Sequence, residues 1–459
     1  MKLKTHSTVE ASRVHEVLKK HILADGYEMV LDLEKSRGSY LHDARTGKEY
    51  LDFFTFFASN PLGMNHPKLA EDQDFLERLQ RAAINKPSNS DIYTREMAEM
   101  VDTFDRIGIP DYLPHAFFIS GGALAVENAL KVAFDWKVRK NFEKGYRQER
   151  GFKVLHLDRA FHGRSGYTLS LTNTLPNKTK YFAKFDWPRI ESPALEFPLN
   201  DERLVDVQER EEQAIKQAKR YFESYPDQIA AIILEPIQGE GGDRHFRPEF
   251  HEALRELADK HEALLIYDEV QTGIGMTGRF WAHEHFVKPD ILAFGKKAQV
   301  CGILAGKRVD EVPDNVFEVS SRINSTWGAN LTDMVRFTRV LEVIEEDHLV
   351  QHAEETGNYL QKQIDDSNEE TQDALETLKR NIPERTQAVR DAIDTIDRNL
   401  AESNAAVRDA LDTIDHHVEE SNEAVRDALD TVEENVSESN EAIRNALDRL
   451  KEAFAPDRS

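Results

Sequence analysis

Four short apolar runs, each ending at a glycine turn or a carboxylate, constrain the fold of this 459-residue chain more than any other feature. Short runs of this kind, separated by amphipathic helical stretches, are typical of buried strands in a parallel sheet. The runs are Phe117–Ile119, Val154–Leu157, Ile232–Leu234 and Leu264–Tyr267. We therefore predict an α/β domain with a mostly parallel central sheet between about residues 76 and 345. In such a sheet, ligands bind at the loops that follow the strand ends.

A strand-end carboxylate and a lysine on a later loop form the most informative pair of residues. Asp268 ends one apolar run, and Lys296 follows 28 residues later in the segment Phe294-Gly295-Lys296-Lys297. An enzyme that uses pyridoxal phosphate (PLP) needs both groups, because the lysine amine holds the cofactor as a Schiff base and the carboxylate keeps the pyridine nitrogen protonated. Taken alone, a strand-end Asp is more often a cap, and a Lys-Lys pair ordinarily lies on the surface.

Three further turns fit the same site. Small residues at a strand-to-helix turn let backbone N–H groups approach a phosphate, and the helix N-terminus favours its negative charge. An aromatic residue followed by His-Gly can lay its ring on a flat cofactor, and a glycine-rich turn that carries two carboxylates keeps its backbone close to a ligand. The alternatives are an ordinary turn, a core phenylalanine and a plain loop. The three turns are Ser120–Ala123, Arg159–Arg164 and Glu235–Gly242.

In order and approximate spacing, these segments resemble the class III (ω-amino) PLP-dependent aminotransferases. The resemblance rests on residues 121–131, 161–167, 235–242, 268–273 and 294–302. Within that class, the chain is most similar to the lysine ε-aminotransferases, at residues 51–59, 85–91, 167–174, 185–190 and 324–328. The resemblance extends from about residue 12 to about residue 362, and it implies the fold of the type I PLP-dependent transferases.

The resemblance implies a role for each residue of the cofactor site. Lys296 would be the Schiff-base lysine, with its neighbour Lys297 as the alternative, and Asp268 would pair with the pyridine nitrogen. Gln271 would reach the ring hydroxyl. Phe161 and Val270 would lie on the two faces of the ring, and Gly122 and Ala123 would donate backbone N–H groups to the phosphate. The complete set expected to bind the cofactor is Gly122, Ala123, Phe161, His162, Glu235, Asp268, Val270, Gln271, Lys296 and Thr326.

The same resemblance implies substrate-binding and catalytic roles outside the cofactor contacts. Arg164 would anchor the far carboxylate of the substrate, which suits a planar bidentate guanidinium. Glu240 would act as a switch residue that shields a second arginine while lysine is bound and swings away for 2-oxoglutarate. Asn324 would contact substrate, and both Asn324 and Thr326 would reach the partner's site in a homodimer. Lys296, Asp268 and Glu240 are thus the expected catalytic residues, and no metal is expected.

The implied reaction moves the terminal amino group of L-lysine to 2-oxoglutarate, giving 2-aminoadipate 6-semialdehyde and glutamate. Lys296, freed from the cofactor, would act as general acid/base on the substrate carbon. Two alternatives remain open: another ω-amino donor such as ornithine or 4-aminobutyrate, or a PLP-binding but inactive scaffold.

The C-terminal part departs from the family. From Ser367 onward the chain is a tandem repeat of 18 residues without an Arg-Phe-Arg-Pro-Pro-Leu-like strand, so the expected second arginine is missing. Because 18 residues are five helical turns, the apolar stripe stays on one helix face and predicts an amphipathic helix or coiled coil. The predicted domains are residues 1–75 (N-terminal part of the small domain, with a hairpin at 40–51), 76–345 (PLP-binding domain), 346–366 (connecting helix) and 367–459 (repeat).

Composition favours a cytoplasmic enzyme. The anionic stripe of the repeat does not favour binding to nucleic acid or an anionic membrane. The net charge of −25 fits a salt-adapted, halophilic cytosol, although an acidic mesophile is the alternative. The single cysteine, Cys301, excludes an internal disulfide, and we expect it to pack rather than react. We find no N-terminal apolar signal segment and no run of the roughly 20 apolar residues that cross a bilayer.

Overall fold

The computed structural model describes residues 9–197 and 199–364. Residues 9–197 and 199–360 belong to one compact unit. The predicted repeat of residues 367–459 lies outside the described residues, and so do the first eight residues of the chain. In the described part, no helix is both long and apolar enough to cross a membrane.

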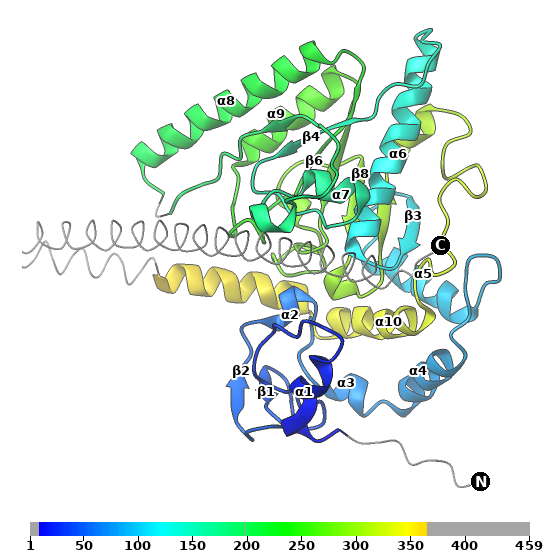
Figure 1. The fold of residues 1–459 in the computed structure, drawn as a ribbon, viewed down its shortest axis with the longest axis vertical. Coiled ribbons are helices and arrows are strands. Elements are labelled where there is room, and N and C mark those ends of the chain that lie inside the picture. The colour runs from blue at the N-terminus through cyan, green and yellow to red at the C-terminus, as the bar shows by residue number, and fades with distance from the viewer. Residues whose placement is uncertain (1–8, 198, 365–459) are drawn as a thin grey trace, which may run out of the picture. The chain divides into compact units, whose positions relative to one another are not determined.

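A seven-stranded sheet forms the centre of this compact unit (Figure 1). Its strand order is β3-β9-β8-β7-β6-β4-β5, and only β9 runs antiparallel to its neighbours. The prediction of a mostly parallel sheet is therefore confirmed, and the carboxyl ends of the other strands meet at one edge. The strands are β3 (His115–Ile119), β4 (Lys153–Leu157), β5 (Arg189–Ile190), β6 (Ile229–Leu234), β7 (Leu264–Asp268), β8 (Ile291–Phe294) and β9 (Cys301–Ala305).

Helices cover both faces of this sheet, which explains why its strands are apolar throughout. Helix α6 (Gly122–Glu143) packs on one face, while α8 (Asp201–Ser224) and α9 (Pro248–Lys260) pack on the other (Figure 1). Successive residues of a strand point to opposite faces. Accordingly, Ile266 belongs to the core under α6, and Leu265 and Tyr267 belong to the core under α9.

A third apolar cluster lies beside β8 and β9 and is built by α4 (Gln73–Asn85), α5 (Arg95–Ile107) and α10 (Leu331–Glu346). Phe104 lies at its centre, with edge-on contacts to Trp281, Phe294 and Phe337 at ring-centroid distances of 5.3 to 6.3 Å. Because Phe294 ends β8, this cluster fixes the strand from which the Lys296 loop departs. Residues 349–364 continue as a helix after α10.

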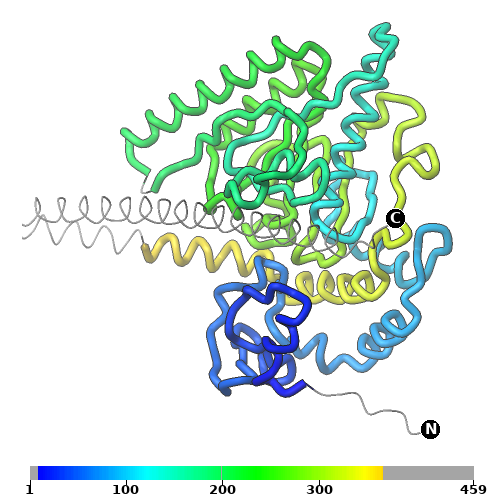
Figure 2. Tube along the Cα trace, viewed as in Figure 1, coloured from blue at the N-terminus to red at the C-terminus, as the bar shows by residue number. Residues whose placement is uncertain are grey.

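The N-terminal segment contains the predicted hairpin, which the structure confirms. Strands β1 (Tyr40–His42) and β2 (Glu49–Leu51) pair antiparallel around a turn that the Asp43 carboxylate stabilises, because it accepts hydrogen bonds from the backbone N–H groups of Val30 and Arg45 at 3.0 Å each. The blue start of the trace in Figure 2 follows this segment. Its remaining helices are η1 (Ala11–Arg13), α1 (Val14–Leu18), α2 (Thr55–Ala58) and α3 (Pro67–Ala70). All four residues of α2 have positive φ, between 45° and 60°, so this short turn is left-handed.

The remaining helices are short and lie in the connections that carry site residues. They are α7 (Gly166–Leu171), η2 (Pro176–Lys178), η3 (Ala282–His285), η4 (Lys296–Ala298) and η5 (Lys307–Glu311). Cys301, at the start of β9, is buried in the core under α6, and burial raises the pKa of its thiol.

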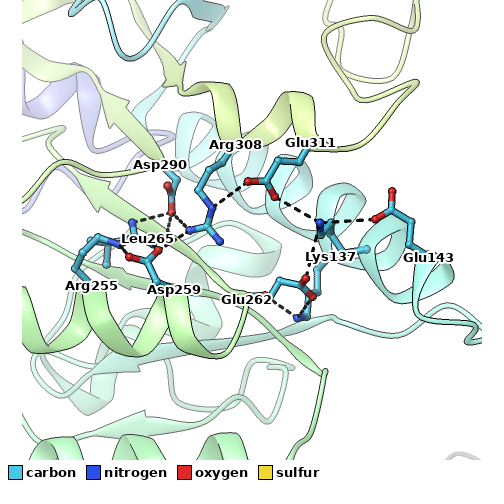
Figure 3. Close-up of polar contacts among 10 residues, drawn as sticks. Lys137, Glu143, Arg255, Asp259, Glu262, Leu265, Asp290, Arg308 and Glu311 are labelled. Atoms are coloured by element: carbon cyan, nitrogen blue, oxygen red, sulfur yellow. Dashed lines mark hydrogen bonds and ion pairs between the residues drawn. The ribbon is translucent and has the colours of Figure 1, made fainter.

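An ion-pair network ties the amino ends of the central strands to the flanking helices (Figure 3). Asp290, just before β8, accepts from Arg255 at 2.8 Å, from Arg308 at 3.0 Å and from the Leu265 N–H at 2.7 Å. The carboxylate is 9% exposed, so these three donors compensate for its loss of water. The network therefore holds β7, β8, α9 and η5 together at the sheet edge opposite the loops that follow the strands.

Candidate active site

Turns that follow strands β3, β4, β6, β7 and β8 enclose a cavity of about 440 Å³ at the carboxyl edge of the sheet. Parallel strands bring together side chains that are far apart in sequence, because all their carboxyl ends meet at one edge. Ten predicted site residues line this cavity, together with Gly163. The lining consists of Gly122, Ala123, Phe161, His162, Gly163, Arg164, Glu235, Asp268, Val270, Gln271 and Lys296.

A buried acid-base cluster forms the floor of the cavity. His162 Nδ1 lies 2.7 Å from Asp268 Oδ2, and the Val270 N–H donates to Asp268 Oδ1 at 3.1 Å. Burial alone lowers the pKa of His162, but the hydrogen bond to Asp268 and the charges of Asp268 and Glu235 outweigh it, so the pKa is raised. An imidazole of raised pKa therefore lies against the Asp268 carboxylate at the floor of the cavity.

Glu235 is the second buried carboxyl group of the cluster. Its Oε1 accepts the Phe161 N–H at 2.9 Å, which fixes the turn after β4 against the end of β6. Burial raises the pKa of Glu235 to about 7, the charge of His162 opposes the rise, and the charge of Asp268 adds to it. The positive charge of the single His162 imidazole thus compensates for two buried carboxyl groups, Glu235 and Asp268.

The two adjacent lysines after β8 point to different places. Lys296 lines the cavity and donates to Gln271 Oε1. Burial lowers the pKa of its amine, although the charges of Asp268 and Glu235 partly oppose this. Lys297 instead donates to the Gln271 carbonyl and lies 3.3 Å from Met276 Sδ, against a separate cavity of about 240 Å³.

The opposite end of the cavity is lined by small residues and backbone. Helix α6 begins at Gly122, and a Cβ there would lie only 2.8 Å from Val270 Cγ1. Gly163 has φ +116°, and a Cβ on it would lie 2.5 Å from the Ala123 Cβ. Glycine at both positions lets the turn after β4 approach the start of α6, whose first N–H groups have no partner within the helix.

Arg164 lies at the exposed rim of the cavity, 5.8 Å from the centroid of the Phe161 ring. The predicted switch residue Glu240 does not line the cavity and forms an ion pair with Lys178. Sequence reasoning missed Lys178, which lies in η2 within no recognisable motif, and it also missed Gly163 as a lining residue although the quoted Phe-His-Gly-Arg motif contains it.

Asn324 and Thr326 are exposed and do not line this cavity. The Ser88 hydroxyl donates to the Thr326 carbonyl at 2.6 Å, and the Ser120 hydroxyl donates to the Trp327 carbonyl at 3.0 Å. These contacts fix the loop close to the start of α6 while its side chains stay at the surface. That placement is compatible with the predicted reach into a partner subunit.

Comparison with known proteins identifies the family of this chain. The sequence profile of the family Aminotransferase class-III matches residues 22–381. This chain belongs to the class III aminotransferase family. It is thus an enzyme of the PLP-dependent transaminase type, and the family resemblance predicted from its motifs is confirmed.

The relatives of this aminotransferase share most of its length. An L-lysine-epsilon aminotransferase from Mycobacterium tuberculosis (strain ATCC 25618 / H37Rv) is 58% identical over 355 residues, covering 77% of this chain and 78% of that protein. One from Amycolatopsis lactamdurans is 53% identical over 352 residues, or 76% and 78% of the two chains. Among solved structures, a lysine aminotransferase from M. tuberculosis is 57% identical with a TM-score of 0.76, covering 79% of this chain and 83% of that one.

The cofactor of this aminotransferase is PLP, as in its family. The residues present fit it. The cavity offers a carboxylate that faces a lysine amine, an aromatic ring and a valine side chain, and a glycine-lined helix start where a phosphate has room. His162 adds a buried Nε2 without a partner among the described residues.

Proposed function

We propose that this aminotransferase transfers the terminal amino group of L-lysine to 2-oxoglutarate, giving 2-aminoadipate 6-semialdehyde and glutamate. The observation that carries the proposal is the joint exposure of Lys296, Asp268 and Arg164 to one cavity. The L-lysine-epsilon aminotransferases to which the chain is 51 to 58% identical support lysine as the donor.

PLP, when bound, supplies an electron sink for the electrons released at the substrate carbon. We assign the cofactor's pyridine nitrogen to Asp268, its ring faces to Phe161 and Val270, and its phosphate to the backbone N–H groups of Gly122 and Ala123. His162 holds the Asp268 carboxylate in place through the hydrogen bond between their side chains, and the pKa of that imidazole is raised. Each of these contacts positions the cofactor before any substrate arrives.

Lys296 is the proposed proton carrier. Its amine is partly buried and its pKa is lowered by burial, so a larger fraction is neutral and able to accept a proton from the substrate carbon. Gln271 accepts from the amine and limits where it can point. Arg164, at the exposed rim, suits the substrate carboxylate that lies farthest from the reacting carbon.

The test compares two substitutions of equal size, Lys296→Met and Lys297→Met, in enzyme incubated with PLP. Lys296→Met should change the absorbance of the bound cofactor and lower turnover of lysine plus 2-oxoglutarate by about 1000-fold or more, because it removes the proton carrier. Lys297→Met should retain the absorbance and keep turnover within about 10-fold, since Lys297 faces another cavity. The reverse pattern would exchange the roles of the two lysines.

A donor panel decides between lysine and the alternatives. Lysine should exceed ornithine and 4-aminobutyrate in kcat/KM, and a higher value for either of those would change the donor. Cofactor absorbance without turnover of any donor would instead favour the inactive scaffold. The homodimer, with Asn324 and Thr326 reaching the partner's site, remains part of this proposal.

A further inference from the structure

A separate cavity of about 240 Å³ lies against Lys297, and we call it the Lys297 cavity. Segments that are far apart in the sequence enclose it: the end of the N-terminal segment, the turn after β7, and α10 with the helix that follows it. Lys297 is the one charged side chain among the described residues that line it. The aliphatic part of the wall includes Pro61, Ile274, Ile344, Leu349 and Val350.

The Lys297 amine is buried without an anionic partner. The residue is 5% exposed, and its amine donates to the Gln271 carbonyl and lies 3.3 Å from Met276 Sδ. An ammonium group has three N–H donors, and a thioether sulfur is only a weak acceptor. In the described part of the chain, the amine forms no ion pair with a carboxylate. The strongest kind of acceptor for this group is therefore missing.

The amine nevertheless keeps its charge at neutral pH. Burial, with a smaller contribution from the charge of Lys296, lowers the pKa of Lys297 to about 8, although the charge of Glu269 opposes the change. An amine with this pKa is still mostly protonated at pH 7. The Glu269 carboxylate is engaged elsewhere, because its Oε1 accepts the His283 N–H at 2.8 Å and its Oε2 accepts the Ala282 N–H at 2.7 Å. A buried positive charge without a close counter-ion thus borders an aliphatic cavity, which favours an anion from outside the chain.

The size and polarity of the Lys297 cavity define the rest of that anion. An apolar protein cavity of about 150 Å³ holds benzene, so about 240 Å³ suits an apolar group of about four to seven carbons. A dicarboxylate does not suit it, since a second carboxylate would lose its water against aliphatic side chains. A cationic amine would be repelled by Lys297. A single carboxylate with an aliphatic tail satisfies both the charge and the wall.

We propose that the Lys297 cavity is a second ligand site of this enzyme, which binds a small aliphatic monocarboxylate with its carboxylate on Lys297 and its tail along the aliphatic wall. The site is independent of the proposed function, because none of the described residues lines both this cavity and the active-site cavity. Neither substrate of the proposed reaction matches it, since lysine carries ammonium groups and 2-oxoglutarate carries a second carboxylate.

The first test measures hexanoate binding to the PLP-loaded enzyme at pH 7 by titration calorimetry. Lys297→Met should weaken hexanoate binding about 10- to 100-fold, because the charged partner of the carboxylate is lost. Lys296→Met is the matched control and should leave binding within about 3-fold, since Lys296 lines the other cavity. Hexylamine, which has the same tail and the opposite charge, should bind at least about 10-fold more weakly than hexanoate.

Two outcomes of this titration would overturn the proposal. Hexanoate binding that survives Lys297→Met but is lost in Arg164→Met would place the acid in the active-site cavity. Hexylamine binding as tight as that of hexanoate would show that the Lys297 charge does not select the ligand. Retained cofactor absorbance shows that each variant is folded. The titration needs no turnover, so an enzyme that fails to react with lysine would refute the proposed function and leave this inference intact.

A chain-length series tests where the tail lies. From propionate to hexanoate, affinity should rise by up to about 4-fold for each added methylene, because each one leaves water for the aliphatic wall. Ala353 also lines the cavity, and Ala353→Leu fills part of it without removing the amine. This variant should weaken hexanoate binding about 10-fold and shift the optimum to shorter acids. An affinity that ignores chain length, or a series that Ala353→Leu does not alter, would contradict the proposal.

Discussion

His162 Nδ1 lies 2.7 Å from Asp268 Oδ2, and both side chains are buried, although 106 positions separate them in the chain. One residue follows β4 and the other ends β7, so the contact spans the one strand between them, β6. A charge-assisted hydrogen bond in a buried site is stronger than one in water. This contact is therefore central both to the stability of the site and to the charge that it presents.

Replacement of His162 by Gln should destabilise the enzyme by roughly 1–3 kcal/mol at pH 6, because Asp268 keeps its burial and loses its charged donor. The pKa of His162 is raised in the folded state above the ordinary 6.5. Its contribution is thus fully present below pH 6.5 and is lost as the pH rises through the folded value. In urea unfolding, the difference in free energy of unfolding between wild type and variant should narrow as the pH rises across this range. His21→Gln, at an exposed position, should show no gap at any pH.

The Glu235 carboxyl group should make the stability of the protein depend on pH, whereas a glutamine at this position should not. Burial raises its folded pKa to about 7 from 4.5, so wild-type enzyme loses stability as the pH rises from about 4.5 to about 7, while the unfolded chain ionises first. Glu235→Gln keeps an acceptor for the Phe161 N–H and should therefore stabilise the protein at pH 8, by at most about 3 kcal/mol, with no gain at pH 4. A thermal-unfolding series over pH measures this. A gain that is independent of pH would contradict the raised pKa.

Asp290 should be far more important for stability than Asp259, although both pair with Arg255 and Arg308. The Asp290 carboxylate is 9% exposed and Asp259 is 57% exposed. Removal of Asp290 leaves the buried Leu265 N–H without its acceptor and the two arginines with only the exposed Asp259, so Asp290→Ala should cost about 3–5 kcal/mol. Asp259→Ala should cost less than about 1 kcal/mol, because exposed ion pairs contribute little.

Chemical denaturation of the two variants tests this comparison. Folded molecules of either variant should retain the kcat of wild type at the same temperature, since the network lies at the strand edge opposite the cavity. Similar costs for both variants would show that burial does not decide the strength of this network.

Mixing of two defective variants tests whether Thr326 completes the partner's site. Lys296→Met removes the proposed proton carrier, and Thr326→Ala removes the proposed phosphate donor of the neighbouring subunit. A mixed dimer would then have one site with both residues intact. Co-refolded variants should recover up to about a quarter of wild-type activity, because half of the dimers are mixed and each carries one intact site. No recovery would place Thr326 in its own subunit's site or remove it from the site altogether.

Local sequence patterns predicted the parts of this protein that depend on neighbours in the chain. The apolar runs predicted the strands of a mostly parallel sheet, and the motifs that follow them predicted ten residues that line one cavity. This worked because the carboxyl ends of parallel strands meet at one edge, whatever the order of the strands. The hairpin at residues 40–51 was also predictable, because its two strands and its turn are neighbours in the chain.

Contacts between distant segments were decided only by the tertiary structure. Lys178 lies in a segment without a motif, and its pairing with Glu240 exists only because η2 and the turn after β6 converge beside Phe161. Lys296 and Lys297 are adjacent and chemically identical, and only the path of the chain after β8 directs one amine into the cavity and the other away from it. Sequence patterns encode periodicity and turn chemistry, whereas the choice between such side chains depends on packing and burial, which arise only when the whole sheet has formed.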